Sequence, residues 1–566
     1  MFNKSAEKTS ALLIFIGAPL TTLFLITDTV TDPVNAPKLL VAGGVGFAML
    51  FVFLAFNLTS NLRLFTPLIV ATLLFNVAAL NSVIQSESPF AQNMYGAFGR
   101  NTGLIAYLVL GFIALGALNL RESKNFKRII LGLQFAGLIN VFYCAWVLVF
   151  GDFLSWSNPY GNILGLFGNP NFISAFLGIF ISTLAAFSFI QGQSWKYRVA
   201  AFLVGIVAFY EIYRSHSIQG LVVTFSGLGM IGFYVVRSKF KSRIVQAGYV
   251  LISAFLATLA LLGALQKGPF DFIYKRSVSL RGTYWKSAIE MGTSRPFSGV
   301  GMDSFGDWYR RARPPIALID TPGINTTTNA AHNVVLDFFA YGGWPLLLSY
   351  LAILIIGAIA IMKVTLRRKS YDGVFVAMAT AWATYQLQSI ISINQIGLAI
   401  WGWLLTGTLV AYEYSTRSTE EGALQPNSNK RRASKKADAG VFSPQLIAGL
   451  GLVVGLIVAC PPLSADTKWR SALESKNGDQ VMGALKSSYL SPSDTYRYAQ
   501  ATQLFANSNL LPQAHEVALE AIAFNPDSYD NWRNLYFLSN SSAEEKAMAV
   551  KNLKRLDPLN PDVTTP

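Results

Sequence analysis

Residues 333–362 read NVVLDFFAYGGWPLLLSYLAILIIGAIAIM, an apolar run in which Asp337 is the only charged residue. A helix needs about 20 predominantly apolar residues to cross the hydrocarbon core of a bilayer. The run therefore predicts a transmembrane helix. It begins directly after a charged and aromatic segment, so the residues at the junction are expected to lie at a membrane surface.

The composition of the whole chain supports this interpretation. Of the 566 residues, 52% are hydrophobic and only 13% are charged, whereas soluble domains carry about a quarter charged residues. The net charge of +15 does not by itself indicate a nucleic-acid partner, and we expect none. Cys144 and Cys460 lie inside apolar runs, so we interpret them as core residues and expect neither a disulfide framework nor a cysteine metal site.

Similar apolar runs recur along the chain and predict an all-α polytopic bundle with about 12–13 transmembrane spans. We place thirteen spans at residues 11–27, 37–57, 64–83, 102–119, 129–150, 171–190, 199–213, 218–236, 245–264, 333–362, 373–391, 394–413 and 443–464. The first run has no clear small-residue cleavage site, which favours an uncleaved span over a signal peptide. The eleventh and twelfth spans are short and are separated by a turn near Ser392–Asn394.

The loops between these spans alternate in charge. One set carries basic clusters, including residues 121–128 and 237–243, while the other short loops are nearly free of cations. Cationic loops tend to stay in the cytoplasm. We therefore predict a cytoplasmic N-terminus, with the long loop 266–332 and the C-terminal tail on the outer side of the membrane.

The same pattern divides the chain into four parts. Residues 1–415 form a membrane domain that includes the long outer loop 266–332, residues 416–442 form a basic cytoplasmic linker, residues 443–464 form the last transmembrane helix, and residues 465–566 form an extracytoplasmic helical tail. In the tail, Pro492 and Tyr498 recur 34 residues later as Pro526 and Trp532. This period is typical of tetratricopeptide repeats. An ordinary small helical domain is the alternative.

The sequence lacks many catalytic signatures, including a P-loop, a G-x-S-x-G elbow and an H-E-x-x-H motif. With only three histidines, a histidine-rich metal site is excluded. The long outer loop instead concentrates arginine and lysine, with nine cations against five acids. Arginine binds phosphate bidentately, so this excess predicts either a site for an anion at the outer surface or a solvated loop with scattered ion pairs.

His332 is the candidate for proton transfer. It stands in Ala331–His332–Asn333, directly before the apolar run. A histidine at a membrane surface could titrate near neutrality and accept a proton from an attacking hydroxyl, or orient that hydroxyl. A capping or interfacial role is the alternative interpretation.

Several segments together resemble the O-antigen ligase and polymerase family of bacterial membrane glycosyltransferases. The resemblance covers roughly residues 10–415. It rests on three motifs in order, each weak alone: Gly165–Phe172 as the family's G-x-x-x-N-P-N element, Arg281–Gly301 as its R-x-x-x-W…P-x-x-G-x-G stretch, and His332–Asn333 followed by Gly342–Gly343. The many spans, the late outer loop and the repeat-bearing tail also fit this family.

The resemblance implies transfer of a glycan from an undecaprenyl diphosphate carrier to an acceptor hydroxyl, without a nucleotide, metal or other cofactor, at the outer face of the bacterial cytoplasmic membrane. It implies that His332 activates or positions the acceptor and that Arg281 binds the diphosphate. The family's Ser-Arg pair is not matched in residues 213–220, where Arg214, shifted in position, or Gln219 stands instead. This departure puts the second diphosphate ligand in doubt, and Arg100 and Asn333 are further candidates for substrate binding.

The sequence leaves several alternatives open. The protein could be a ligase that uses an acceptor glycolipid, a polymerase that extends a polysaccharide, or a protein O-oligosaccharyltransferase, since these differ in the acceptor. The tail could recruit a protein partner. A lipid or glycan transporter, or a structural membrane scaffold, is the alternative of another class. The transporter hypothesis predicts internal repeats among the spans and charged residues near the bilayer midplane.

Overall fold

The computed structural model describes residues 4–57, 62–271, 274, 276–319, 323–424 and 442–564. Every regular element in these residues is helical, and each of the thirteen predicted spans overlaps a helix. These helices are α1 (Lys4–Leu23), α2 (Asn35–Asn57), α3 (Leu62–Gln85), α5 (Leu104–Ala117), α6 (Ser123–Phe150), α7 (Pro170–Ser188), α8 (Trp195–Arg214), α9 (Ile218–Lys239), α10 (Arg243–Ala264), α13 (Val334–Arg367), α14 (Gly373–Ser389), α15 (Ile396–Leu424) and α16 (Pro444–Ala459).

The fold is that of a polytopic helical membrane protein, as predicted. Among the described helices, eight are long and apolar enough to cross a membrane, or nine if the bent pair α16–α17 is one span. Helices α5 and α14 are short, and α1 and α8 carry several charged residues. Their crossing of the membrane stays a prediction from the alternating loops.

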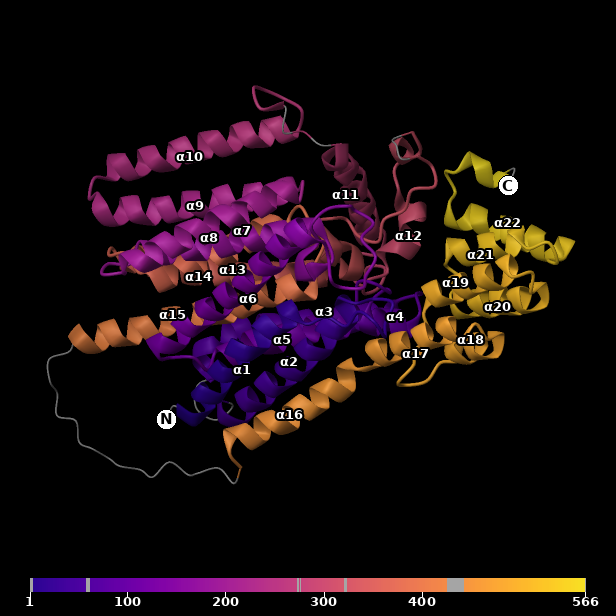
Figure 1. Cartoon of the computed structure of the whole chain (residues 1–566), viewed down its shortest axis with the longest axis horizontal. Helices are drawn as coiled ribbons and strands as arrows, with labels where there is room; N and C mark the ends of the chain where they lie inside the picture. The colour runs from indigo at the N-terminus through magenta and orange to yellow at the C-terminus, as the bar shows by residue number, and fades with distance from the viewer. Residues whose placement is uncertain are drawn as a thin grey trace.

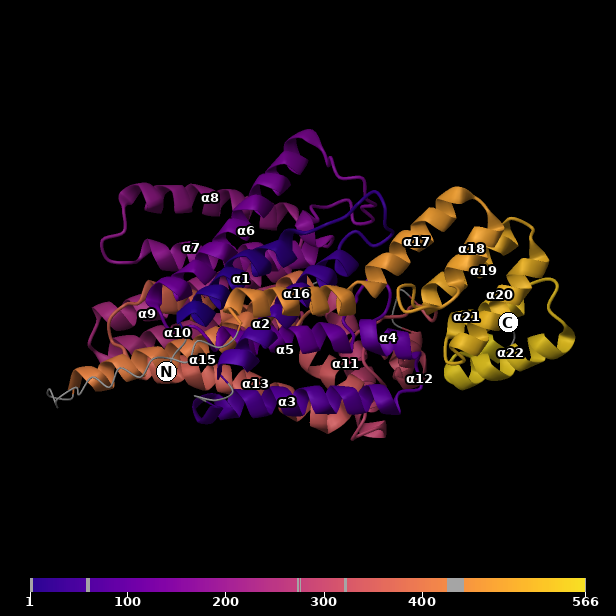
Figure 2. The same ribbon diagram turned by 90° about the horizontal axis from the view of Figure 1, so that it is seen from below.

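The spanning helices lie side by side along the long axis of the molecule (Figure 1). Both views place the helices of the long loop, α11 (Arg276–Ser294) and α12 (Phe305–Ala312), at the same end of the bundle as the C-terminal tail (Figures 1 and 2). We call this the loop end. The N-terminus lies toward the opposite end (Figure 1). Helix α15 is largely enclosed by the bundle, whereas α10 lies at its edge against α9 and buries none of its apolar span.

The last membrane helix, α16, packs tightly along α2 because small residues line the contact. A Cβ atom built on Gly455 would lie 2.2 Å from the carbonyl oxygen of Gly43, and one built on Gly43 would lie 2.3 Å from the Cβ of Ala459. Gly451, Gly455 and Ala459 recur every four residues, which places them on one helix face. Small residues at this spacing let helix backbones approach closely within a membrane. The contact fixes the helix that leads into the tail.

Two boundaries differ from the sequence prediction. Helix α15 continues to Leu424, so it enters the segment that we predicted as a linker; residues 425–441 of that linker lie outside the described residues. The predicted last span divides at Cys460, where α17 (Pro461–Ser475) begins and bends away by 45°. A pair of consecutive prolines, Pro461 and Pro462, explains the break, because proline is tolerated in the first turn of a helix but not in its interior.

The regular elements of the tail are all helices in its described part. After α17 it continues with α18 (Gly478–Leu485), α19 (Thr495–Asn507), α20 (Leu511–Phe524), α21 (Tyr529–Phe537) and α22 (Ala543–Leu556), each packed on the next. Tyr498 and Trp532, the pair 34 residues apart, are both buried in the tail's own apolar core. The core is separate from that of the membrane domain. Assignment to the tetratricopeptide class stays a prediction.

Candidate active site

His332 occupies a tight turn directly before α13. Its φ of +56° is a left-handed conformation that is uncommon outside glycine. The turn is held by its neighbours: the His332 Nδ1 atom lies 3.3 Å from the Ala330 carbonyl oxygen, and the buried Asp337 carboxylate accepts a hydrogen bond of 2.7 Å from the Ala331 N–H. If Nδ1 carries the proton and donates to Ala330, Nε2 is the ring atom that can accept a proton.

Asn333 is the N-cap residue of α13, and its side-chain oxygen is directed at the start of that helix. Its side-chain oxygen accepts hydrogen bonds from the N–H groups of Val335 and Leu336, both at 3.1 Å. This is the N-cap arrangement that asparagine favours. The oxygen of this predicted substrate ligand is thus committed to the helix start, and it fixes the residue next to His332.

Helix α11 brings the second motif to His332. It packs along α13, and the Tyr284 ring lies with its centroid 5.5 Å from that of the His332 imidazole, tilted by 35°. Arg281 lies on the same helix, three residues before Tyr284, so the two side chains share a face. The predicted catalytic histidine and the predicted diphosphate ligand therefore belong to one cluster.

The surroundings of His332 keep its ring neutral. The pKa of His332 is lowered to about 4, mainly because the ring is buried; the hydrogen bond to Ala330 opposes this shift, and the positive charges of Arg100 and Arg281 add to it. This places both guanidinium groups within electrostatic reach of the imidazole. At neutral pH the ring can accept a proton.

Among the described residues, no carboxylate pairs with Arg281, in contrast to its neighbours. It is half-buried, and burial lowers its pKa, opposed by the nearby Tyr284. Within the described residues, the other buried or half-buried arginines of the loop end hold acids: Arg100 binds Asp303, Arg295 binds Glu87, Arg310 and Arg313 bind Asp557, and Arg311 binds Asp527. An unpaired cation that is partly removed from water favours an anionic ligand.

Arg100 contacts other residues of the protein through its guanidinium group. Its Nε atom lies 3.4 Å from the buried Asp303 carboxylate, and its Nη1 atom donates to the Asn329 carbonyl oxygen at 3.0 Å. Although burial lowers its pKa, the charge of Asp303 raises it above the ordinary value. Arg100 was predicted as a substrate ligand. The geometry shows instead that it ties the loop before α5 to the loop that carries His332.

Asp303 is the centre of this tie. Its carboxylate also accepts hydrogen bonds from the Ala97 N–H at 2.9 Å, the Thr102 hydroxyl at 3.1 Å and the Tyr341 hydroxyl at 3.3 Å. It thereby joins the loop before α5 to α13.

The arginine excess of the loop is therefore mainly satisfied inside the chain. Arg310, Arg311 and Arg313 pair with acids of the tail, which lies some 240 residues further along the chain. The alternative of ion pairs therefore describes Arg295, Arg310, Arg311 and Arg313, and an anion site at Arg281 stays a prediction. The sequence could not show this, because the partners are remote along the chain.

Arg214 is not part of the cluster. Its Nη1 atom donates to the Tyr210 hydroxyl at 3.0 Å, one turn earlier on α8, and its side chain is exposed. In the described part of the chain it makes no contact with His332 or Arg281. The substitute considered for it, Gln219, donates to the Ile391 carbonyl oxygen at 3.2 Å.

The first motif, Gly165–Phe172, has a structural role that the sequence motif alone did not reveal. Asn169 caps α7, with its side chain accepting from the Asn171 N–H at 2.9 Å. The Asn171 side chain in turn accepts from the Ser217 hydroxyl at 2.8 Å. The motif therefore anchors the turn between α8 and α9, where the expected Ser-Arg pair would stand.

The glycines of the other two motifs pack against each other. The N–H groups of Val300 and Gly301 donate to the carbonyl oxygens of Ala340 and Tyr341 at 2.9 and 3.1 Å. Helix α13 is interrupted at Gly343, whose φ is +63° and whose Cβ position lies 2.2 Å from the Pro296 carbonyl oxygen. The two motifs thus form a joint that places α11 and α13 side by side, and so places Arg281 near His332.

Three residues of the cluster escaped the sequence analysis: Tyr284, Asp303 and Asp337. Each lies inside or within two residues of a motif that was quoted, so proximity to the motif was the available signal. Within the described residues, no three histidine, cysteine, aspartate or glutamate side chains gather as metal ligands would.

The described residues thus form the polytopic helical bundle of a membrane protein, with a neutral histidine at one end beside an arginine that no described carboxylate pairs. Residues 208–351 match the O-antigen ligase family. This match confirms the resemblance drawn from the motifs, and it covers Arg214, Arg281, His332 and Asn333 but not Arg100. No curated protein matches the chain.

Proposed function

We propose that this protein transfers a glycan from an undecaprenyl diphosphate carrier to an acceptor hydroxyl. The observation that carries the proposal is that a half-buried Arg281, which no described carboxylate pairs, lies in one cluster with a neutral His332. The family match supports glycan transfer in general. The positive-inside pattern of the loops supports placing this cluster at the outer face of the bacterial cytoplasmic membrane, with the N-terminus in the cytoplasm.

Arg281 is the diphosphate ligand in this proposal. Its guanidinium fork matches the geometry of phosphate oxygens. When the glycosidic bond breaks, the electron pair and the negative charge move to the diphosphate oxygen. A cation already fixed beside that oxygen stabilises the charge as it develops. The polyprenyl chain stays in the bilayer, so the donor enters from the side of the bundle.

His332 is the base in this proposal. The acceptor oxygen attacks the anomeric carbon, the bond from that carbon to the diphosphate oxygen breaks, and the acceptor proton passes to Nε2 of His332 and then to water. A pKa of about 4 describes a weak base. The negative diphosphate offsets the charges of Arg281 and Arg100, which raises the basicity of His332 once the donor is bound.

The test is complementation of a deletion strain with the wild-type chain, H332A, R281A or the control K286A. Lys286 is exposed on α11 and lies outside the cluster. We expect K286A to restore the surface glycan and the other two to lose it by at least about 100-fold, the usual contribution of a catalytic base. Full restoration by both H332A and R281A would remove the proposal. The product missing from the deletion strain identifies the acceptor class: glycolipid, polysaccharide or protein.

A further inference from the structure

The C-terminal tail touches both loops that carry the candidate site. Helices α17–α22 lie against the loop end of the bundle (Figures 1 and 2). One contact is with the C-terminal end of α12, through Arg310 in its last turn and Arg313 directly after it. The other is with the loop between α4 (Phe90–Tyr95) and α5, through Phe98. Arg100 stands two residues after Phe98, so both contacts reach the surroundings of His332.

Asp557 forms the first contact, just after the end of α22. Its carboxylate oxygens lie 2.6 and 2.7 Å from Nη2 of Arg313 and 3.0 Å from Nη1 of Arg310. The Asp557 and Arg313 side chains are fully buried. Charges removed from water in this way are tolerated only when they are closely paired, and removing one leaves the others uncompensated. The contact is therefore specific to this carboxylate.

The same two arginines also hold the segment before His332. Arg313 donates to the Ile324 carbonyl oxygen at 2.6 Å, and Arg310 donates to the Asn325 carbonyl oxygen at 3.3 Å. Arg100 holds the Asn329 carbonyl oxygen from the other side. Three guanidinium groups thus fix the backbone of residues 324–329, and two of them are oriented by Asp557. His332 follows three residues later.

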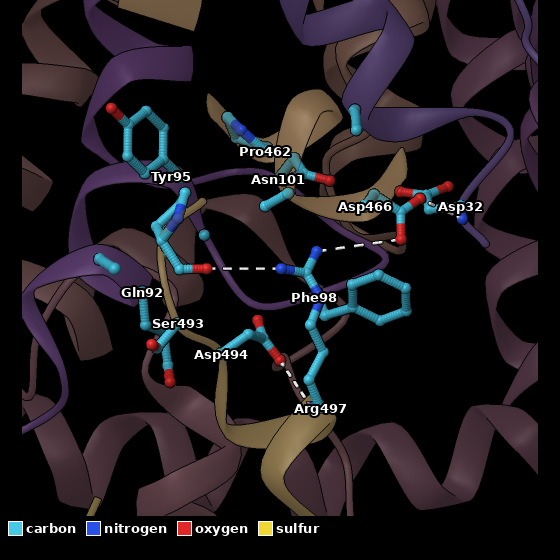
Figure 3. A pocket seen from close by; sticks show the side chains of 15 residues that line it. Asp32, Gln92, Tyr95, Phe98, Asn101, Pro462, Asp466, Ser493, Asp494 and Arg497 are labelled. Carbon is cyan, nitrogen blue, oxygen red and sulfur yellow. Dashed lines mark hydrogen bonds and ion pairs between the residues drawn. The ribbon is translucent and has the colours of Figure 1, made fainter. Parts of the chain in front are cut away.

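The second contact orients the loop of Arg100. The Phe98 ring stacks on Tyr496 of α19 with centroids 4.8 Å apart and planes within 4°. The Arg497 guanidinium lies over the same Phe98 ring at 5.7 Å and 3.9 Å from the Asp466 carboxylate. Figure 3 shows Arg497 beside Phe98 with its guanidinium directed toward Asp466. Asp466 in turn accepts from the Thr31 and Asp32 N–H groups at 2.9 and 2.8 Å. The tail is thus bound to the membrane domain at two separate places.

We propose that Asp557 is a positioning residue for His332. Through it, the tail contributes to the geometry of the active site. Asp557 orients Arg310 and Arg313, these hold residues 324–325, and the held segment places the His332 turn against Tyr284. This inference rests on the proposed role of His332. It gives the tail a function independent of any partner that the tail recruits.

The test compares D557N with the matched control D479N in the full-length protein, purified in detergent. Asp479 is an exposed aspartate in the same tail. We expect D557N to lower kcat about 10- to 100-fold, the effect of misplacing a catalytic group by about 1 Å, with little change in KM for the lipid-linked donor. D479N should stay within about twofold of the wild type. Full activity of a folded D557N protein would overturn the inference.

A second measurement is independent of activity. Hydrogen exchange of residues 324–332 should become faster in D557N, while exchange in α2 and α16 stays unchanged. Unchanged exchange in residues 324–332 would overturn the positioning role even if His332 proved catalytic. Conversely, faster exchange of residues 324–332 in D557N together with full activity of H332A would contradict the proposed function but not the role of Asp557 in holding that segment.

A double variant addresses the folding of D557N, since that change leaves Arg310 and Arg313 with a neutral partner. Combining D557N with R313Q removes one positive and one negative charge and keeps amide groups that can hydrogen-bond. We expect the same loss of kcat and the same faster exchange in residues 324–332. A double variant with the kcat and the hydrogen exchange of the wild type would contradict the inference.

Discussion

The ring of Tyr284 lies with its centroid 5.5 Å from that of the His332 imidazole, and this contact joins two motifs that stand almost fifty residues apart in the sequence. Tyr284 both covers the imidazole and lies on the same helix face as Arg281. The histidine is therefore held in a half-buried position in which its neutral form predominates.

The contact predicts that the ring of Tyr284 matters more than its hydroxyl. We expect Y284F to keep activity within about threefold of the wild type, and Y284A to lose about 10- to 100-fold because the imidazole is no longer held in place. Initial rates of glycan transfer measure both. Equal losses in the two variants would show that the hydroxyl itself takes part.

The pH dependence follows from the depressed pKa of His332. The neutral ring persists down to about pH 4, so the acid limb of kcat/KM, which reports the free enzyme, should lie well below the ordinary histidine value of about 6.5. Arg281 and Arg100 are the charged groups that act on it. Because a bound diphosphate offsets them, the acid limb of kcat should lie at higher pH than that of kcat/KM.

The variant R281Q provides the control for this profile. Removing a positive charge near His332 raises the pKa of the free imidazole, so the acid limb of kcat/KM should move upward toward 6.5. A limb that stays in place in R281Q would mean that Arg281 is too far from His332 to act on it.

Arg100 and Asp303 should behave as one unit. R100Q and D303N each break the tie between the loop before α5 and residue 329, so the double variant should be little worse than the poorer single variant. Residues in one ion-pair network usually show coupling of about 0.5–3 kcal/mol. A double-mutant cycle on activity and on thermal unfolding measures it. Additive effects would indicate that Arg100 acts separately, for instance on the substrate.

The joint at Gly343 predicts a loss of stability on a small substitution. G343A adds a Cβ atom 2.2 Å from the Pro296 carbonyl oxygen at a φ of +63°, and such strain costs about 1–3 kcal/mol. The thermal unfolding temperature in detergent should fall. Gly449 on α16 is the matched control, since a Cβ atom there meets nothing within 4 Å. A G343A protein with the unfolding temperature of the wild type would contradict the close contact between Gly343 and Pro296.

The helices were predictable because apolarity is a local property of the sequence. The two short spans around Ser392–Asn394 are present as α14 and α15 with the turn between them. The capping role of Asn333 was also within reach, since asparagine directly before an apolar run is a helix-start signal. The proximity of His332 and Arg281 followed from the family resemblance, and no local pattern could have shown it.

The roles of the other arginines were not predictable. Arg310 and Arg313 find their carboxylate at Asp557, across about 245 residues, and no spacing rule connects such positions. Arg214 was matched by position to a family pattern that this sequence does not follow. Arg100 could not be separated from a substrate ligand until Asp303 and the Asn329 carbonyl oxygen were seen to hold it.

The central claim is that His332 and Arg281 serve a single lipid-diphosphate site in different ways. The most direct measurement is turnover by the purified protein of an undecaprenyl-diphosphate-linked glycan, together with binding of that donor. We predict that H332A binds the donor with an affinity near that of the wild type but releases no undecaprenyl diphosphate, and that R281A loses donor affinity. Normal turnover by H332A, or normal donor binding and turnover by R281A, would contradict the account.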